Sequence, residues 1–241
     1  MLQTLLPFIS PILLAFGFWR FFVKPDSFWF LAFLSILLII LTIKILAKKH
    51  FLHFFRLWVN LAIVYLAQIL FLIVVNLPTW RYILTVFYIL LWFAIFWLIA
   101  KYFKSLKDIN DLDYLAFTRF LYYLSFWQLA CTFYYLIVFI NFSPWLSLLL
   151  FLVLALFFAK EIFLLNEKIV SGFIWLLLFT LAQVFLALFL MPISFYVAGT
   201  IAALWFFFLL EWSLASFKSF VQWLVIFLVA SAALLISSLS F

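Results

Sequence analysis

Five polar side chains fall inside long apolar stretches, where a membrane protein could use them to bind a solute. They are Gln68, Gln128, Thr132, Thr180 and Gln183. Gln128 and Thr132 are four residues apart and Thr180 and Gln183 three, spacings that place each pair on one face of a helix. The set predicts either a neutral polar pocket for a small solute or lipid head group, or hydrogen bonds between helices. We favour the hydrogen bonds, because no charge would fix a ligand there.

A second group of candidates surrounds the two histidines. His50 and His53 are three residues apart, but the neighbouring cations would repel a metal ion, and the chain has no second cluster of ligands. Basic and aromatic residues together are typical of the membrane interface. We therefore expect lipid head-group contact through Lys48, Lys49, His50, His53 and Arg56. No metal and no cofactor is expected.

Three carboxylates, Asp108, Asp111 and Asp113, lie within six residues of one another in the polar stretch 101–113. They could bind a divalent cation or serve a lipid-modifying enzyme at the membrane interface. A hard cation also needs a preformed shell and a Gly-assisted turn, neither of which is visible here. A prenyltransferase-like site would need a second aspartate cluster. A polar loop is the simpler interpretation, with partner docking ahead of catalysis as a functional alternative.

Other chemistry finds little support in the sequence. Cys131 is the single cysteine, so it has no disulfide partner, and no nearby His or Arg would activate its thiol. Three glycines are too few to build a phosphate-binding loop. We assign no catalytic residue and expect that the chain is not an enzyme.

The composition shows what must position these side chains. Of 241 residues, 73% are hydrophobic and 9% are charged, against about 45 to 50% and about 25% in soluble domains. So few polar residues could not cover the apolar ones in water. The chain is therefore expected to be a single integral membrane domain over residues 1–241, with the lipid bilayer as its main partner.

Nine apolar runs approach the roughly 20 residues that a helix needs to cross a bilayer. The predicted spans are Leu5–Val23, Phe28–Ala47, Phe54–Leu77, Trp80–Ala100, Leu115–Ile140, Pro144–Leu165, Ile169–Leu190, Ile193–Trp212 and Ser219–Ser237. The first run contains Pro7 and Pro11, so eight spans are the alternative. The fold class is an all-α, polytopic transmembrane helix bundle.

The distribution of Lys and Arg predicts the direction of insertion, because positive loops tend to stay in the cytoplasm. With the N-terminus inside, eleven basic residues lie on the inner side, and only Arg20, Lys24 and Arg81 lie on the outer side. The net charge of +7 is thus explained by topology and lipid contact, and nucleic acid is not expected as a partner.

The charged residues are all predicted to lie near span ends. Ionisable groups near the bilayer centre usually mark ion or proton pathways. Their absence from the predicted centre argues against a proton-coupled carrier and against a channel with a charged selectivity ring.

Two predicted hairpins resemble each other. Gln68, Pro78 and Trp92 of the first are echoed by Gln183, Pro192 and Trp205 of the second, at offsets of 113 to 115 residues. Four spans separate the copies, so they would form a parallel repeat. Chance matches are common in so apolar a chain, and both interpretations stay open.

The stretch Phe189–Gly199, with Leu181-Ala182-Gln183 before it, resembles a hairpin in uncharacterised small multi-span membrane proteins of candidate-phylum bacteria. The resemblance covers about thirty residues. It implies the cytoplasmic (inner) membrane of a bacterium and implies no activity.

These observations favour a non-enzymatic membrane subunit, scaffold or uncoupled carrier, whose partners would be other membrane subunits or a second copy. Two alternatives remain. One is a transporter of a small solute or lipid with a neutral Gln-lined pocket, and the other is a lipid-modifying enzyme that uses the aspartate cluster.

Overall fold

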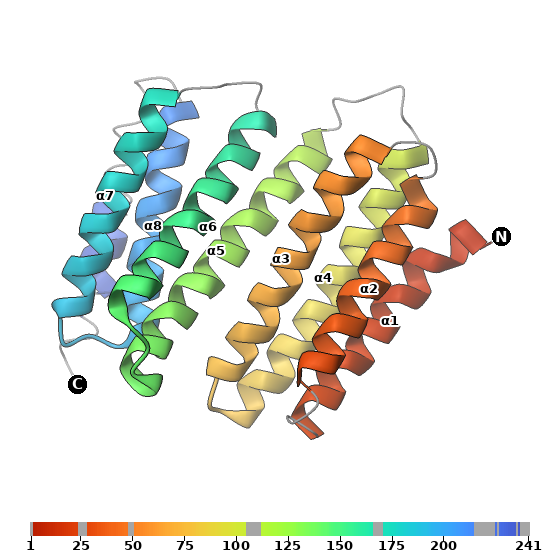
Figure 1. The fold of residues 1–241 in the computed structure, drawn as a ribbon, viewed down its shortest axis with the longest axis horizontal. Coiled ribbons are helices and arrows are strands. Elements are labelled where there is room, and N and C mark those ends of the chain that lie inside the picture. Colours follow the sequence, from red (N-terminus) through yellow and green to blue (C-terminus); the bar gives the residue numbers. More distant parts are fainter. Residues whose placement is uncertain are drawn as a thin grey trace. The chain divides into compact units, whose positions relative to one another are not determined.

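The structure is a computed structural model of the chain. It describes residues 2–23, 28–47, 51–104, 112–165, 171–214, 225, 227–234 and 236. Throughout these ranges the chain is almost entirely helical and contains no strand (Figure 1). The prediction of an all-α helix bundle is confirmed.

The named helices follow the predicted runs closely. They are α1 (Leu2–Val23), α2 (Phe28–Ala47), α3 (Phe51–Val74), α4 (Pro78–Lys104), α5 (Leu112–Ile140), α6 (Pro144–Leu165), α7 (Ser171–Leu190) and α8 (Phe195–Leu214). The described residues between 225 and 236, in the ninth predicted run, are also helical.

Seven of these helices, α2 to α8, are long and apolar enough to cross a membrane. The apolar stretch of α1, Leu5–Arg20, is shorter, and Pro7 and Pro11 lie inside the helix. Crossing by α1 and by the last run therefore stays a prediction. The chain is a multi-pass membrane protein.

Proline marks the tight turns between consecutive helices. Pro78 and Pro144 are the first residues of α4 and α6, where a missing N–H costs nothing because the first turn has no carbonyl to bond it. Pro192 lies in the turn before α8, whose N-terminus is capped by Ser194, since the Val197 N–H donates to Ser194 Oγ at 3.3 Å. Pro25, between α1 and α2, lies outside the described residues.

The contacts divide the chain into two compact units, residues 1–118 and residues 119–241. In the first unit α1 packs along α4 and α2, α2 packs on α3, and α3 contacts α4. Its core is aromatic: the Phe18 ring lies 5.2 Å from that of Tyr65 and 5.8 Å from that of Tyr88.

The second unit has a similar aromatic core. Phe126 on α5 stacks on Phe206 of α8, with ring centroids 3.9 Å apart, and contacts Phe151 of α6 at 5.1 Å. Helix α7 contacts both of its neighbours in the sequence, α6 and α8. Of the C-terminal residues, Phe227 stacks on Phe208 of α8 at 5.1 Å.

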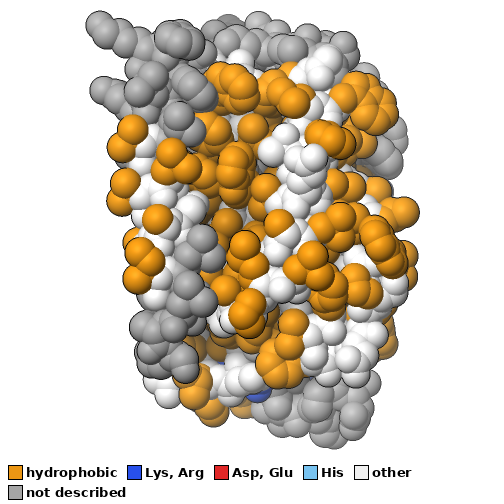
Figure 2. Space-filling model, turned by 90° about the vertical axis from the view of Figure 1, so that its left-hand side faces the viewer, with side chains coloured by type: hydrophobic (Ala, Val, Ile, Leu, Met, Phe, Trp, Pro, Cys, Tyr) orange, Lys and Arg blue, Asp and Glu red, His pale blue; other side chains and the backbone are white. Residues whose placement is uncertain are grey.

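Large apolar side chains cover the outer surface of the helices. Trp29, Trp145 and Trp175 are 81%, 70% and 75% exposed. Figure 2 shows hydrophobic side chains spread over the side of the molecule on which α7 lies in Figure 1. Monomeric soluble proteins rarely expose such extended apolar surface, whereas lipid tails solvate it without cost. The surface thus fits a bilayer environment.

Candidate functional site

Gln68 bonds one helix of the first unit to another. Its side chain on α3 is fully buried, and Oε1 accepts a hydrogen bond from Trp92 Nε1 of α4 at 2.7 Å. The Tyr65 ring meets the Trp92 ring edge-on at 5.9 Å. No described residue bonds the Gln68 Nε2. The contact is therefore an interhelical hydrogen bond inside a packed aromatic core.

Gln128 and Thr132 lie together on α5 in the second unit, and both are buried. The Thr132 hydroxyl donates to the Gln128 backbone carbonyl at 2.8 Å, one turn earlier in the same helix. Gln128 and Thr132 therefore share one face of α5, as predicted. The Thr132 hydroxyl donates its hydrogen bond within its own helix.

Thr180 and Gln183 occupy a different environment on α7. Thr180 is half-buried, whereas the Gln183 side chain is exposed. Within the second unit, Gln183 therefore does not join Gln128 in a buried polar cluster, and Gln68 belongs to the other unit. The apolar stretch around Gln183 gave no signal for this, because almost every residue of α7 is hydrophobic and either face could have been buried.

The predicted head-group contacts fall largely beyond what the structure describes. Lys48, Lys49 and His50 lie outside the described residues, as do Asp108 and Asp111. His53 and Arg56 are in the first turns of α3, and Asp113 is in the first turn of α5, but their side chains are not described. Among the described residues no group of three or more His, Cys, Asp or Glu could hold a metal ion.

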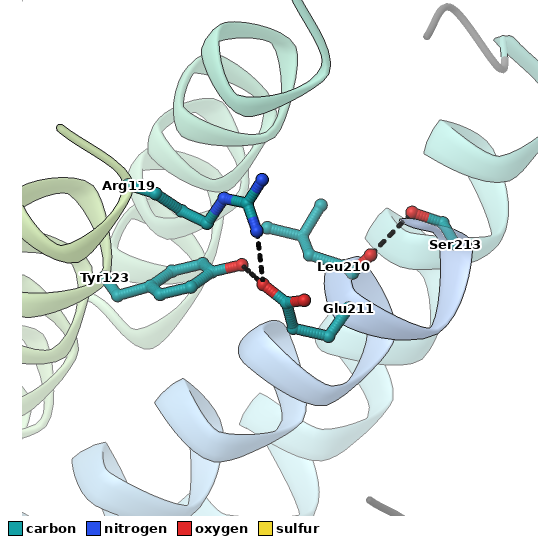
Figure 3. Close-up of polar contacts among 5 residues, drawn as sticks. All are labelled: Arg119, Tyr123, Leu210, Glu211 and Ser213. Atoms are coloured by element: carbon teal, nitrogen blue, oxygen red, sulfur yellow. Dashed lines mark hydrogen bonds and ion pairs between the residues drawn. The ribbon is translucent and has the colours of Figure 1, made fainter. Parts of the chain in front are cut away.

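A charged contact joins the beginning of α5 to the end of α8, and sequence reasoning missed it. Tyr123 OH donates to Glu211 Oε1 at 2.6 Å, and Arg119 Nη1 lies 3.4 Å from the same oxygen (Figure 3). In the same turn of α8 the Ser213 hydroxyl donates to the Leu210 carbonyl at 2.7 Å. Arg119 and Glu211 are 92 residues apart, so only the fold brings the charges together.

The Arg119–Glu211 contact also constrains the topology of the second unit. Arg119 lies two turns from the start of α5, and Glu211 lies one turn from the end of α8. These two helix ends must therefore be on the same side of the membrane, as alternating spans require. The pair is partly exposed, with 30% and 25% of the two side chains accessible, so the ion pair itself contributes little and the short tyrosine bond contributes more.

Helices α5 and α8 approach each other closely at a glycine. A Cβ on Gly199 would lie 2.5 Å from both Cα and N of Cys131, so only glycine fits against this stretch of backbone. Beside the crossing, Trp127 Nε1 donates to Thr200 Oγ1 at 3.0 Å, and the Thr200 hydroxyl donates to the Tyr196 carbonyl at 2.6 Å. Small residues and side-chain hydrogen bonds are the usual means of joining helices in membranes.

Comparison with known proteins adds no functional information. No protein-family model matches the chain, and neither a curated protein nor a solved structure is similar to it. The class of protein that fold and polar contacts define is a multi-pass helical membrane protein.

Proposed function

We propose that this chain is a non-enzymatic membrane subunit or scaffold, a protein that acts by packing its helices in the bilayer. One observation carries the proposal. The best-placed of the predicted pocket residues, Gln68, uses its carbonyl oxygen to hold α3 against α4 through Trp92. A buried amide engaged in this way stabilises a bundle, whereas a carrier needs its amides turned toward a solute.

The other interhelical contacts point in the same direction. Trp127 bonds α5 to α8 through Thr200, and Tyr134 OH on α5 donates to the Phe185 carbonyl of α7 at 3.1 Å. A third interhelical contact joins Tyr123 and Arg119 of α5 to Glu211 of α8. Each contact joins elements of one bundle, which is what a structural role requires.

We further propose that the protein resides in the cytoplasmic membrane of a bacterium with its N-terminus inside. The excess of basic residues on one side supports the direction. The hairpin resemblance at 189–199 supports the bacterial membrane. Lipid is the proposed main partner, with other membrane subunits or a second copy beside it.

Reconstituted vesicles separate this function from its two alternatives. The purified chain is placed in liposomes, and permeability to glycerol, erythritol and ribitol is measured by stopped-flow light scattering. A scaffold leaves the permeabilities equal to those of empty vesicles, and a carrier of neutral solutes raises at least one of them. A rise that Gln68→Leu or Gln128→Leu abolishes would overturn the proposal in favour of a Gln-lined carrier.

The enzyme alternative is tested in the same vesicles. They are prepared from a total polar lipid extract and incubated with the protein, and the lipids are then separated by mass. A scaffold leaves the lipid profile unchanged. Lipid turnover that disappears in an Asp108→Ala, Asp111→Ala, Asp113→Ala variant with intact folding would show the aspartate cluster to be catalytic and overturn the proposal.

A further inference from the structure

Gln183 is an exposed amide in the middle of a membrane-spanning helix. It lies seven residues from the end of α7, which is about 10 Å along the helix axis. Among the described helices, the exposed charged side chains Lys44, Lys101 and Lys160 are all within five residues of a helix end. Those lysines can reach the head groups, but a glutamine at this depth cannot.

Apart from Trp175, the exposed residues of α7 form a continuous stripe, which we call the α7 outer face. It consists of Gly172, Leu176, Phe179, Gln183, Ala187 and Leu190. Successive members are three or four residues apart, the spacing of one helix face and of a helix–helix seam. Of the span Gly172–Leu190 only 22% is buried, against 61% for the span of α3. Figure 2 shows the side of the molecule to which α7 belongs.

The polar residue at the centre of this face distinguishes it from an ordinary lipid-facing surface. Hydrocarbon offers no hydrogen-bond partner, so an exposed amide is costly there. None of the described residues bonds the Gln183 side chain. Small residues on the same stripe favour close approach: a Cβ added at Gly172 would meet nothing within 4 Å, and Ala187 is one turn from Gln183.

A second copy of this chain is the partner that fits best. Every copy inserted in the same direction carries Gln183 at the same depth, so a two-fold axis along the membrane normal brings the two amides together. Each glutamine amide has both a donor and an acceptor, so the two Gln183 side chains can each donate a hydrogen bond to the other. A different protein would need a polar side chain at the matching depth, which a second copy supplies by construction.

We propose that the α7 outer face is the interface of a homodimer, centred on a reciprocal pair of Gln183 side chains. This inference rests on the proposed function, because it names the partner with which the chain's helices associate. Gln183 is then an interface residue rather than part of a solute pocket.

Single-cysteine cross-linking tests the location of the interface. In a Cys131→Ala background, Phe179→Cys on the α7 outer face is compared with Val153→Cys on α6. Val153 is 54% exposed and, like Phe179, lies in the middle of its span, so it is the matched control. Copper phenanthroline in native membranes should convert Phe179→Cys to disulfide-linked dimer several times more efficiently than Val153→Cys. Equal yields would overturn the proposal.

The role of the amide is tested by dimer affinity in liposomes, measured by single-molecule photobleaching over a range of protein densities. Loss of two interhelical bonds in Gln183→Leu should raise the dissociation constant about ten- to hundredfold. Gln183→Asn keeps the amide and should recover part of the affinity. Both variants should keep the stability of the monomer, because the side chain is exposed.

The outcomes separate this inference from the function on which it rests. An unchanged dissociation constant in Gln183→Leu, or a monomer at every density, would overturn the dimer. The second result would mean that lipid, another protein or another part of the same chain covers the face. If the chain is monomeric and the vesicles stay impermeable, only the dimer is overturned and the scaffold function stands. If the chain is dimeric and the vesicles admit glycerol, only the scaffold function is overturned.

Discussion

Replacing Gly199 with alanine tests how closely α5 and α8 must approach. The new Cβ would lie 2.5 Å from Cα and N of Cys131 and 2.6 Å from its Sγ. Non-bonded carbon atoms are normally about 3.5 to 4 Å apart, so the helices must separate by about 1 to 1.5 Å. The obstacle is mostly backbone, which cannot rotate away as a side chain can.

The separation affects two kinds of interaction. Strain or repacking around an inserted methyl group costs about 1 to 3 kcal/mol. The hydrogen bond from Trp127 to Thr200, now 3.0 Å, would stretch beyond bonding distance and lose about 0.6 to 2 kcal/mol. We therefore expect Gly199→Ala to lower the free energy of unfolding by about 2 to 5 kcal/mol. Titration of SDS into detergent micelles, followed by tryptophan fluorescence and circular dichroism, measures this change.

Gly172 supplies a matched control. An added Cβ there meets nothing within 4 Å in the monomer, and alanine is the better helix former, so Gly172→Ala should leave the stability of the monomer unchanged or raise it by up to about 1 kcal/mol. Adding Cys131→Ala to Gly199→Ala should rescue little, since it removes Sγ and leaves the backbone contacts. Equal stability of Gly199→Ala and the wild type would refute the close crossing, and full rescue would refute its backbone origin.

Two further substitutions follow from the polar contacts and use the same unfolding assay. Gln68→Met should lower the free energy of unfolding by about 1 kcal/mol, because the Trp92 N–H loses its acceptor, and a double-mutant cycle with Trp92→Phe should give a coupling of about 0.6 to 2 kcal/mol. A coupling near zero would show that the bond does not form. Tyr123→Phe should cost about 1 to 2 kcal/mol, more than Arg119→Gln, because its bond to Glu211 is shorter and the ion pair is partly exposed. The reverse order would mean that the charge dominates the contact.

The helices were predictable because each needs only local information. An uninterrupted apolar run of sufficient length has one stable conformation in hydrocarbon, and proline at the first helical position marks where the next helix begins. Pro78 and Pro144 illustrate this, since α4 and α6 begin at those residues. Hydrophobicity therefore locates a span without reference to its neighbours.

The polar contacts were less predictable because they depend on which face of each helix is buried. In a soluble helix the apolar stripe reveals that face, but here lipid-facing and core-facing residues are equally apolar. Gln68 and Gln183 stand in similar sequence surroundings, yet one is fully buried and the other exposed. The contact of Arg119 with Glu211 was hidden for a different reason: nothing local links positions 92 residues apart.

The two units nevertheless share one order of helix neighbours. In the first, α1 contacts α2 and α4, α2 contacts α3, and α3 contacts α4. In the second, α5 contacts α6 and α8 through Phe126, while α7 contacts α6 and α8. The four helices of each unit thus share these neighbours, although α2 also contacts α4 in the first unit. This agreement is of the kind that the predicted parallel repeat would produce, but consecutive packing of any four antiparallel helices would produce it too.

The spacing within the hairpins explains why the matching residue types do not make matching contacts. Gln68 and Trp92 are 24 residues apart and face each other across the turn at 75–77. Gln183 and Trp205 are 22 residues apart, across a turn at 191–194 that is one residue longer. Each residue turns a helix by about 100° and advances it by about 1.5 Å, so the changed spacing displaces one side chain relative to the other. Trp205 instead contacts Phe227, with ring centroids 4.7 Å apart, and Gln183 is left on the outer face of α7. If the hairpins share an origin, the changed spacing converted an internal helix contact into a polar group available to another chain.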